Sequence, residues 1–217
     1  NIELRLGTEI GSWVKTSDGY TVTTKDNSES WDCRLLIDAS GANSRFSRKE
    51  AGQKMDNDHH AAAVRAYWKG VTGFHKDNFI ELHFLEKYNP GYFWIFPLPN
   101  GEVNIGLGMR SDIVKRKKIN LREALDEIIV SDEFKDRFKD AVQIDPTVGY
   151  GLPLGSKDRV LSGDNYLLVG DAGHLIDPLT GEGIGNATYS GFILSLIPIF
   201  RRRRPTPWRP PWPPPPY

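Results

Sequence analysis

One segment of the sequence combines a carboxylate with glycines at spacings that suit ligand binding. Asp171 follows the apolar run 166–169 and Gly170. That run is typical of a short buried strand, and open α/β sheets bind ligands at the carboxyl ends of their strands. A helix is expected from about residue 182, and three glycines stand near its start: Gly181, Gly183 and Gly185. Glycines let the backbone approach a ligand closely, and the free N–H groups of a helix N-terminus attract an anion. The segment therefore predicts a ligand site, with a tight structural loop as the alternative.

A run of aromatic residues marks a second candidate site. Tyr92, Trp94 and Phe96 alternate along an expected strand, so their rings lie on one face of it. The run ends at Pro97, and two glycines follow after eight residues: Gly106 and Gly108. Three rings in a row form an apolar wall, and alternating glycines leave room for a close ligand or ring. A stripe of core aromatic residues is the alternative.

The elements that must position these residues are mainly strands. Strands are expected at 2–6, 20–24, 31–37, 63–68, 79–85, 92–98, 103–109 and 166–169. The four strands between 63 and 109 are closely spaced with short turns, which predicts an antiparallel sheet. A helix capped by Asn120 is expected next, and a second helix begins near residue 131. The basic run 115–118 is interpreted as an exposed loop.

Composition excludes several classes of function. The formal net charge is zero, but five of the 28 basic residues lie in 201–217, which leaves 23 basic against 28 acidic residues in the rest. A mildly acidic body gives no electrostatic case for nucleic-acid binding. Cys33 is the single cysteine, so no intrachain disulfide can form and a reducing compartment fits. No apolar run approaches the ~20 residues of a membrane span, and no set of residues predicts a metal site.

The end of the sequence differs in composition from the body. Residues 205–217 contain eight prolines in thirteen positions, which cannot fold into a packed element. Residues 194–197 also resemble translated sequencing-adapter sequence. We interpret 194–217 as a non-native tail, and a basic, proline-rich docking tail is the alternative. The sequence also lacks an initiator Met, so we interpret the chain as truncated at both ends.

The stretches 38–48 and 158–186 resemble the flavin-binding motifs of the p-hydroxybenzoate hydroxylase-like FAD superfamily. Gly41, Ser44 and Arg48 match the internal motif of that superfamily, whereas Ser40 stands where an Asp is usual. In the hydroxylase branch that Asp is tied to NADPH use, so Ser40 argues against direct handling of NADPH. A plain strand-to-turn loop is the alternative for 38–48.

This resemblance implies FAD as the cofactor. The residues implied to bind FAD are Gly41, Ser44, Arg48, Gly170, Asp171, Ala172, Gly173, Pro178, Gly181, Gly183, Ile184 and Gly185. Asp171 would accept hydrogen bonds from ribityl hydroxyls. The N–H groups near Gly183 and Ile184 would stabilise negative charge at the N1–O2 edge of the flavin. The Gly-x-Gly-x-x-Gly loop that binds the ADP half of FAD in this superfamily does not occur in the sequence.

Residues 92–108 resemble the Tyr-x-Trp-x-Phe-Pro…Gly-x-Gly pattern of the geranylgeranyl reductases. The residues implied to bind substrate are Tyr92, Trp94, Phe96, Pro97, Gly106 and Gly108. The resemblance implies an enzyme that reduces C=C bonds of a prenyl lipid or a quinone side chain, with hydride from reduced FAD and a proton from an unidentified donor. The alternatives are another flavoenzyme of the superfamily (a monooxygenase, a halogenase or a quinone-linked oxidoreductase) and a chain that is inactive as a fragment.

The expected fold class is α/β with α+β character: a partial, Rossmann-like FAD-binding domain with an inserted antiparallel sheet that binds substrate. Residues 1–48 and 151–193 are assigned to the FAD-binding domain, 49–150 to the substrate domain and 194–217 to the tail. The expected partners are a prenyl lipid or other apolar substrate and an electron donor, either NADPH or a ferredoxin-like protein. We expect a cytoplasmic protein with peripheral membrane contact and no nucleic-acid partner.

Overall fold

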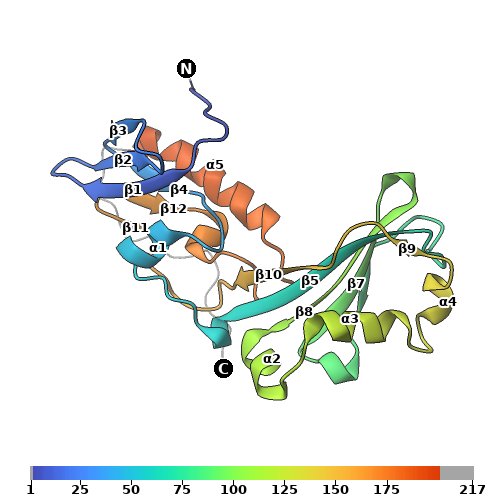
Figure 1. Ribbon diagram of the computed structural model, residues 1–217. Helices are drawn as coiled ribbons and strands as arrows, with labels where there is room; N and C mark the ends of the chain where they lie inside the picture. Colours follow the sequence, from blue (N-terminus) through green and yellow to red (C-terminus); the bar gives the residue numbers. More distant parts are fainter. Residues whose placement is uncertain (1, 201–217) are drawn as a thin grey trace. The chain divides into compact units, whose positions relative to one another are not determined.

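The chain passes four times between two structural units in the computed structural model, which describes residues 2–200 (Figure 1). The first unit comprises Asn1–Lys54, Asp158–Leu175 and the residues from Gly183 onward. The second unit comprises Met55–Lys157 and Ile176–Glu182. Both units combine strands with helices, and the second contains a large antiparallel sheet. The mixed fold class expected from the sequence is therefore confirmed.

The first unit contains two small sheets. One is antiparallel and joins β1 (Ile10–Lys15), β2 (Tyr20–Thr24) and β3 (Ser30–Cys33) in sequence order. The other has the order β11-β12-β4, with β11 at Ser162–Gly163, β12 at Tyr166–Leu168 and β4 at Leu36–Asp38. Because β12 runs parallel to β4, the carboxyl ends of these two strands meet at one edge of the sheet.

Helices in the first unit follow these carboxyl ends. They are α1 (Arg45–Glu50), the 3-10 turn Gly170–Gly173 and α5 (Ile184–Phe200). The small core is aromatic: the Phe46 ring of α1 lies edge-on against Tyr20 and Tyr166, with ring centroids 5.4 and 5.5 Å apart. Burial of these rings fixes α1 beside the parallel strand pair, since aromatic side chains supply much apolar area.

Two expectations for the first unit are corrected. Residues 2–9 form no strand, and Ile2 and Leu6 are 98% and 82% exposed, because no described strand pairs with this segment. The strand expected at 31–37 is divided between β3 and β4, which belong to different sheets. Residues 194–200, the first part of the segment interpreted as a tail, lie within α5, which continues to Phe200. The rest of the segment interpreted as a tail, 201–217, lies outside the described residues.

The second unit is organised around a six-stranded antiparallel sheet. Its strand order is β10-β5-β8-β7-β6, and β9 pairs with β5 beyond the end of β10. The strands are β5 (His60–Lys69), β6 (Glu81–His83), β7 (Gly91–Pro97), β8 (Glu102–Arg110), β9 (Val142–Gln143) and β10 (Val148–Pro153). The four strands expected between 63 and 109 are all present, with β6 shorter than its expected range.

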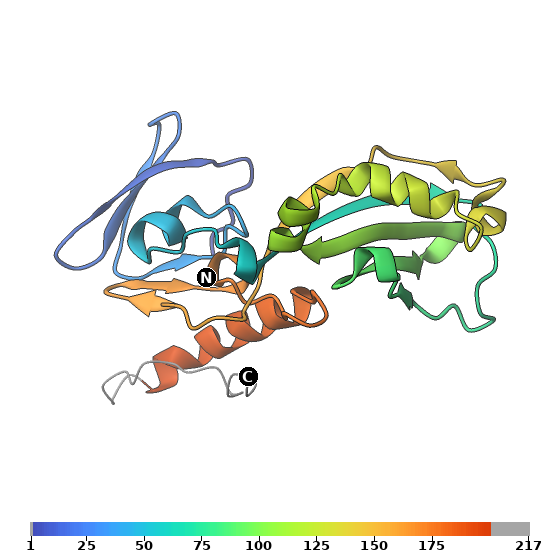
Figure 2. The ribbon, with the colours of Figure 1, turned by 90° about the horizontal axis from the view of Figure 1, so that it is seen from below.

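Helices cover one face of this sheet, as Figures 1 and 2 show for α2 and α3. The helices are α2 (Ser111–Lys117), α3 (Leu121–Ile129) and α4 (Lys135–Phe138), and the 3-10 turns are Asn57–His59, Glu86–Tyr88 and Pro99–Gly101. Strand alternation sends Phe93, Ile95 and Leu107 to the covered face, where each is 0% exposed. The opposite face of the sheet therefore carries Tyr92, Trp94 and Phe96, as the sequence predicted.

Helix starts and ends in the second unit follow local chemistry. The Asn120 side chain accepts a hydrogen bond from the backbone N–H of Arg122 at 3.1 Å, so the cap predicted for α3 is confirmed. The basic run 115–118 is not a loop, because its first three residues form the last turn of α2. Cations are favourable at a helix C-terminus, where the dipole is negative.

The segment Ile176–Glu182 belongs to the second unit, although the sequence assigned it to the FAD-binding domain. Ile176 forms a parallel bridge with Leu154 at the end of β10, and the Gly155 N–H donates to the Ile176 carbonyl at 2.7 Å. These backbone contacts join residues that are about twenty positions apart in the sequence. The roles assigned to the two domains stay a prediction.

Candidate functional site

The two segments implied to bind FAD begin at the same sheet edge in the first unit. Asp38 ends β4, and Gly170 follows β12 after one residue. The strands are in register, with Leu168 opposite Asp38, and the Val169 N–H donates to the Asp38 carbonyl at 3.1 Å. The structure thus brings the predicted residues Gly41 and Ser44 onto the same edge as Gly170–Gly173.

Asp38 organises the first of these segments. The buried carboxylate accepts hydrogen bonds from the Ser40 N–H at 3.0 Å, from the Ser40 hydroxyl at 2.5 Å and from the Ser44 hydroxyl. The Ser44 oxygen in turn accepts from the Ser47 N–H at 2.8 Å and so caps α1. Sequence reasoning missed Asp38 as a site residue, although a carboxylate at the end of an apolar strand was a signal for it.

The predicted residues of 38–48 differ in what their side chains do. Ser44 is buried, and its hydroxyl is used inside the loop. Arg48 is exposed and donates to the Asn43 carbonyl at 2.9 Å. The Ser47 hydroxyl donates to the Ala172 carbonyl at 2.7 Å, which connects α1 to the turn after β12. This bond fixes the two ligand-binding candidates against each other.

Asp171 lies in that turn and has an unusual environment for a carboxylate. It is half-buried, and burial raises the pKa of Asp171 above its ordinary value. No hydrogen bond to its carboxylate occurs within the part of the chain that the structure describes. A partly buried carboxylate without a donor is unfavourable unless a ligand supplies one.

Gly170 determines how this turn packs. Its φ of +53° is in the left-handed region, and a Cβ atom there would lie 3.0 Å from the Ala187 Cβ of α5. Its N–H donates to the Ser190 hydroxyl at 3.1 Å. Gly170 therefore lets the turn lie directly on α5. The N-terminal residues of that helix, Ile184 and Gly185, are exposed.

The predicted residues Pro178 and Gly181 belong instead to a closed loop in the second unit. The Asp177 carboxylate accepts from the N–H groups of Leu179 and Thr180 at 3.1 and 2.7 Å. Burial raises the pKa of Asp177, but these hydrogen bonds together lower it by more, so the net shift is downward. The Tyr92 hydroxyl donates to the Thr180 carbonyl, which fastens the loop to β7.

A groove lies on the open face of the large sheet, and all the residues that line it belong to the second unit. Its cavity volume is about 610 Å³. Small residues form its floor: Ala61, Ala63 and Gly108. Aromatic rings form one wall, with centroids 6.0 Å apart between Tyr92 and Trp94 and 6.1 Å between Trp94 and Phe96. Among the described residues, no carboxylate and no histidine lines the groove.

Two interactions hold the Trp94 ring on the groove face. Its Nε1–H donates to the Asn104 side-chain oxygen at 2.8 Å. The ring lies over Gly106, where an added Cβ would come within 2.1 Å of the indole and 2.3 Å of the Val64 carbonyl oxygen. Gly108 is different, because a Cβ there would meet the ring only at 3.6 Å. Gly106 thus makes room for a protein ring, and Gly108 leaves open floor.

Tyr92 closes the groove at the loop of Pro178 and Gly181. Burial raises the pKa of Tyr92, and the nearby Asp177 raises it further. The hydroxyl is therefore protonated at neutral pH. Pro97 lies at the end of β7, next to Phe96. The structure thus gathers the predicted substrate residues on one strand pair, β7 and β8.

Sequence reasoning missed a charged residue on the groove face. Arg65 of β5 lines the groove, and its Nη1 lies 2.6 Å from the Asp145 carboxylate. Its guanidinium lies over the Tyr67 ring at 4.5 Å and near the Tyr150 ring at 5.9 Å. An arginine inside an otherwise apolar strand was the available signal.

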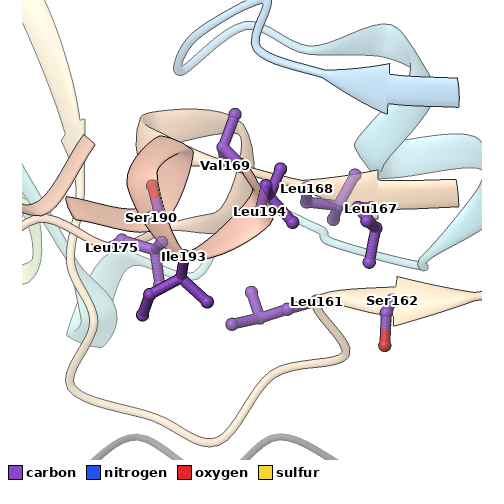
Figure 3. A pocket seen from close by; sticks show the side chains of 9 residues that line it. All are labelled: Leu161, Ser162, Leu167, Leu168, Val169, Leu175, Ser190, Ile193 and Leu194. Atoms are coloured by element: carbon purple, nitrogen blue, oxygen red, sulfur yellow. The ribbon is translucent and has the colours of Figure 1, made fainter. Parts of the chain in front are cut away.

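A second, smaller hollow belongs to the first unit, and Figure 3 shows side chains of β12, α5 and neighbouring residues gathered around it. Its volume is about 100 Å³. The lining is apolar except for Ser162 and Ser190, and it contains no titratable group. This hollow offers apolar surface but no chemistry.

The fold is shared with proteins of known structure. The structure of CmlS, a flavin-dependent halogenase, matches the fold with a TM-score of 0.69 and 23% identity, over 90% of this chain and 36% of that protein. The structure of a geranylgeranyl bacteriochlorophyll reductase-like protein from Thermoplasma acidophilum matches with a TM-score of 0.71 and 25% identity, over 85% of this chain and 46% of that protein.

Sequence comparison gives the family. Residues 60–149 match the model of the geranylgeranyl reductase catalytic domain. A menaquinone reductase of Mycobacterium tuberculosis is 34% identical over 73% of this chain and 39% of its own length. A digeranylgeranylglycerophospholipid reductase of Methanococcus vannielii is 30% identical over 90% of this chain and 49% of its own length. Residues 60–149 thus match a geranylgeranyl reductase catalytic domain, and the resemblance to that family is confirmed. The chain spans about half the length of the curated relatives that it matches.

Proposed function

We propose that the protein is an FAD-dependent oxidoreductase that reduces C=C bonds of a prenyl lipid or of a quinone side chain. The observation that supports this most strongly is the groove of the second unit, with aromatic walls and a floor of alanine and glycine. A long, methyl-branched prenyl chain fits an apolar trough of this kind. Burial of apolar surface there stabilises the complex by about 25 cal/mol per Å².

The groove residues hold the hydrocarbon in place by shape. Gly106 lets the Trp94 ring lie over β8, and Asn104 fixes the ring by its hydrogen bond. The Gly108 floor beside that ring leaves space for a chain. Tyr92 keeps its hydroxyl proton because burial raises its pKa. Tyr92 and Tyr150 are the tyrosines that line the groove among the described residues.

One observation indicates that the residues of the first unit suit FAD. The Asp171 carboxylate is half-buried and without a hydrogen-bond donor in the described part of the chain, so a ligand hydroxyl would satisfy it. The predicted neighbour Gly41 would admit the cofactor, because an added Cβ there meets no atom within 4 Å, whereas the Cβ positions of Gly170 and Gly173 face Ala187 and Leu161. When bound and reduced, FAD would supply the hydride that the reduction of a double bond requires.

The partners and the location of the protein are part of this proposal. A prenyl lipid as substrate places the protein at a membrane surface while it acts, because such lipids reside in membranes. Among residues 2–200, no helix combines the length and the apolar character needed to cross a bilayer. The electron donor is proposed to be NADPH or a ferredoxin-like protein, and Ser40 favours the second.

Turnover by the flavin-loaded protein tests the proposed function. The flavin is reduced chemically without oxygen, a geranylgeranyl lipid is added, and the product is analysed by mass spectrometry. We expect the gain of two hydrogens for each double bond reduced. A flavin-loaded protein that leaves every prenyl substrate unsaturated would contradict the proposal. Oxygen uptake coupled to an oxygenated or halogenated product would instead identify another flavoenzyme of the superfamily.

A further inference from the structure

Arg65 is a charged residue in an apolar groove, and neighbouring side chains hold it in position. It stands on β5 opposite Gly106 of β8, on the same face as the Trp94 ring. Its side chain is 25% exposed. Desolvation lowers the pKa of Arg65, but hydrogen bonding to Asp145 and to the Tyr150 hydroxyl outweighs it, so the net shift is upward. The guanidinium is therefore always charged.

Asp145 is positioned by the backbone around it and not by Arg65 alone. Its second carboxylate oxygen accepts from the Tyr67 N–H at 2.7 Å, and this bond is the main cause of the lowered pKa of Asp145. The Ile144 N–H donates to the Tyr67 carbonyl at 2.8 Å. The segment before β10 is thus fastened to β5, and the guanidinium is held at one position.

The guanidinium still has donors to offer. Its ion pair with Asp145 uses Nη1, and no other carboxylate within the described residues contacts it. Arg110, a second arginine that lines the groove, is different. Its Nε and Nη2 donate to both oxygens of Asp112 at 3.0 and 2.8 Å, so this pair of parallel donors is already occupied. A planar guanidinium with donors left over is suited to bind a phosphate by two hydrogen bonds.

We propose that Arg65 binds the phosphate of a prenyl lipid head group and so orients the substrate in the groove. The inference rests on the proposed function, because it assigns the two ends of the ligand within the same groove. With the phosphate at Arg65, the hydrocarbon would lie over the small residues Ala63 and Ala61 toward the loop of Pro178 and Gly181. Ala61 lies four positions before Arg65 on β5, a length of about 13 Å.

Calorimetric binding to the full chain tests this inference. The probes are geranylgeranyl monophosphate and the uncharged alcohol geranylgeraniol, both below their micelle concentrations, with inorganic phosphate as a third titrant. We expect the monophosphate to bind about tenfold to a hundredfold more tightly than the alcohol, as hydrogen bonds to a charged group would provide. Inorganic phosphate alone should bind weakly, because it lacks the apolar chain.

Substitutions test whether Arg65 causes the preference for the monophosphate. Arg65→Gln should remove the preference for the monophosphate and leave the affinity for the alcohol unchanged. Arg65→Lys should keep part of the preference, because it keeps the charge but loses the planar fork. Arg110→Gln is the matched control and should keep the whole preference. If Arg65→Gln fails to fold, the partial loss in Arg65→Lys, set against the full preference in Arg110→Gln, still assigns the effect to Arg65.

The outcomes separate this inference from the proposed function. Equal binding of monophosphate and alcohol, or tighter binding of menaquinone than of the monophosphate, overturns the role of Arg65 and leaves a prenyl-binding groove in place. Arg65 would then be a structural partner of Asp145. If inorganic phosphate binds as tightly as the monophosphate, the site holds a free anion and not a lipid head group. If none of the prenyl probes binds, both the inference and the proposed function are contradicted.

Discussion

Asp171 shows how a residue can be unfavourable for folding and suitable for binding. Its carboxylate sits at the end of a buried strand, where partial burial opposes its charge. Asp38, at the same sheet edge, is more deeply buried but accepts hydrogen bonds from Ser40 and Ser44. The difference between these two aspartates indicates that Asp38 shapes the loop, whereas Asp171 is left for a ligand.

Replacing Asp171 by Asn should therefore separate stability from binding. Because the folded state raises the pKa of Asp171, its contribution to stability is fully present below the pKa of the unfolded chain, about 3.9, and is lost as the pH rises through the folded value. Without FAD, Asp171→Asn should be more stable than the unmodified chain at neutral pH, and the difference should disappear below about pH 4. Denaturant unfolding at several pH values measures this.

The same substitution should weaken FAD binding about tenfold to a hundredfold, because a charged hydrogen-bond acceptor is lost. Flavin fluorescence quenching gives the dissociation constant. Asp158→Asn is the matched control, since Asp158 is exposed, and it should change neither quantity. An Asp171→Asn chain that binds FAD as tightly as the unmodified chain would show that the carboxylate does not contact the cofactor.

At the scale of the elements, the pair β7 and β8 builds the groove. Tyr92 lies opposite Gly108, and Trp94 lies opposite Gly106. Each aromatic residue thus faces a glycine across the ladder, and the large side chains lie over the positions that lack one. This pairing lets one strand supply the wall and the next strand supply the floor.

Gly106→Ala and Gly108→Ala should consequently have opposite effects. The new Cβ at position 106 would overlap both the Trp94 ring and the Val64 carbonyl oxygen, so we expect a loss of about 1–3 kcal/mol in unfolding free energy and a changed tryptophan fluorescence spectrum. At position 108 the contacts are of ordinary length, so stability should stay nearly unchanged while prenyl alcohol binding weakens. If Gly108→Ala also unfolds the chain, the groove floor has no free space above Gly108.

Elements with local signals were predictable. The alternation of Tyr92, Trp94 and Phe96 gave both the strand and the face that its rings occupy. The Asn120 cap gave the start of α3. Residues 2–6 show the limit of such patterns, because alternation favours a strand only where a neighbouring strand is present to pair with it. The charged end of α2 was missed for a related reason: a lysine run suits both a helix C-terminus and a loop.

At the scale of the whole molecule, the features that were not predicted depend on residues far apart in the sequence. Arg65 meets Asp145 eighty positions later, and no local pattern links them. Ile176–Glu182 joins the second unit through Leu154 and Tyr92, although its neighbours on both sides belong to the first. Residue identities indicated a resemblance to a flavin-binding motif. They did not indicate which part of that motif belongs to which unit.

Within residues 2–200 each unit has an apolar hollow, and we propose that the larger one receives the prenyl chain. The most direct measurement is photolabelling with a diazirine-bearing analogue of geranylgeraniol, followed by peptide mapping. We expect labels in the groove strands, within 61–65, 92–96 and 104–110, and their loss when unlabelled geranylgeraniol competes. Labels concentrated in 161–175 or 190–194, or labels that competition does not remove, would contradict it.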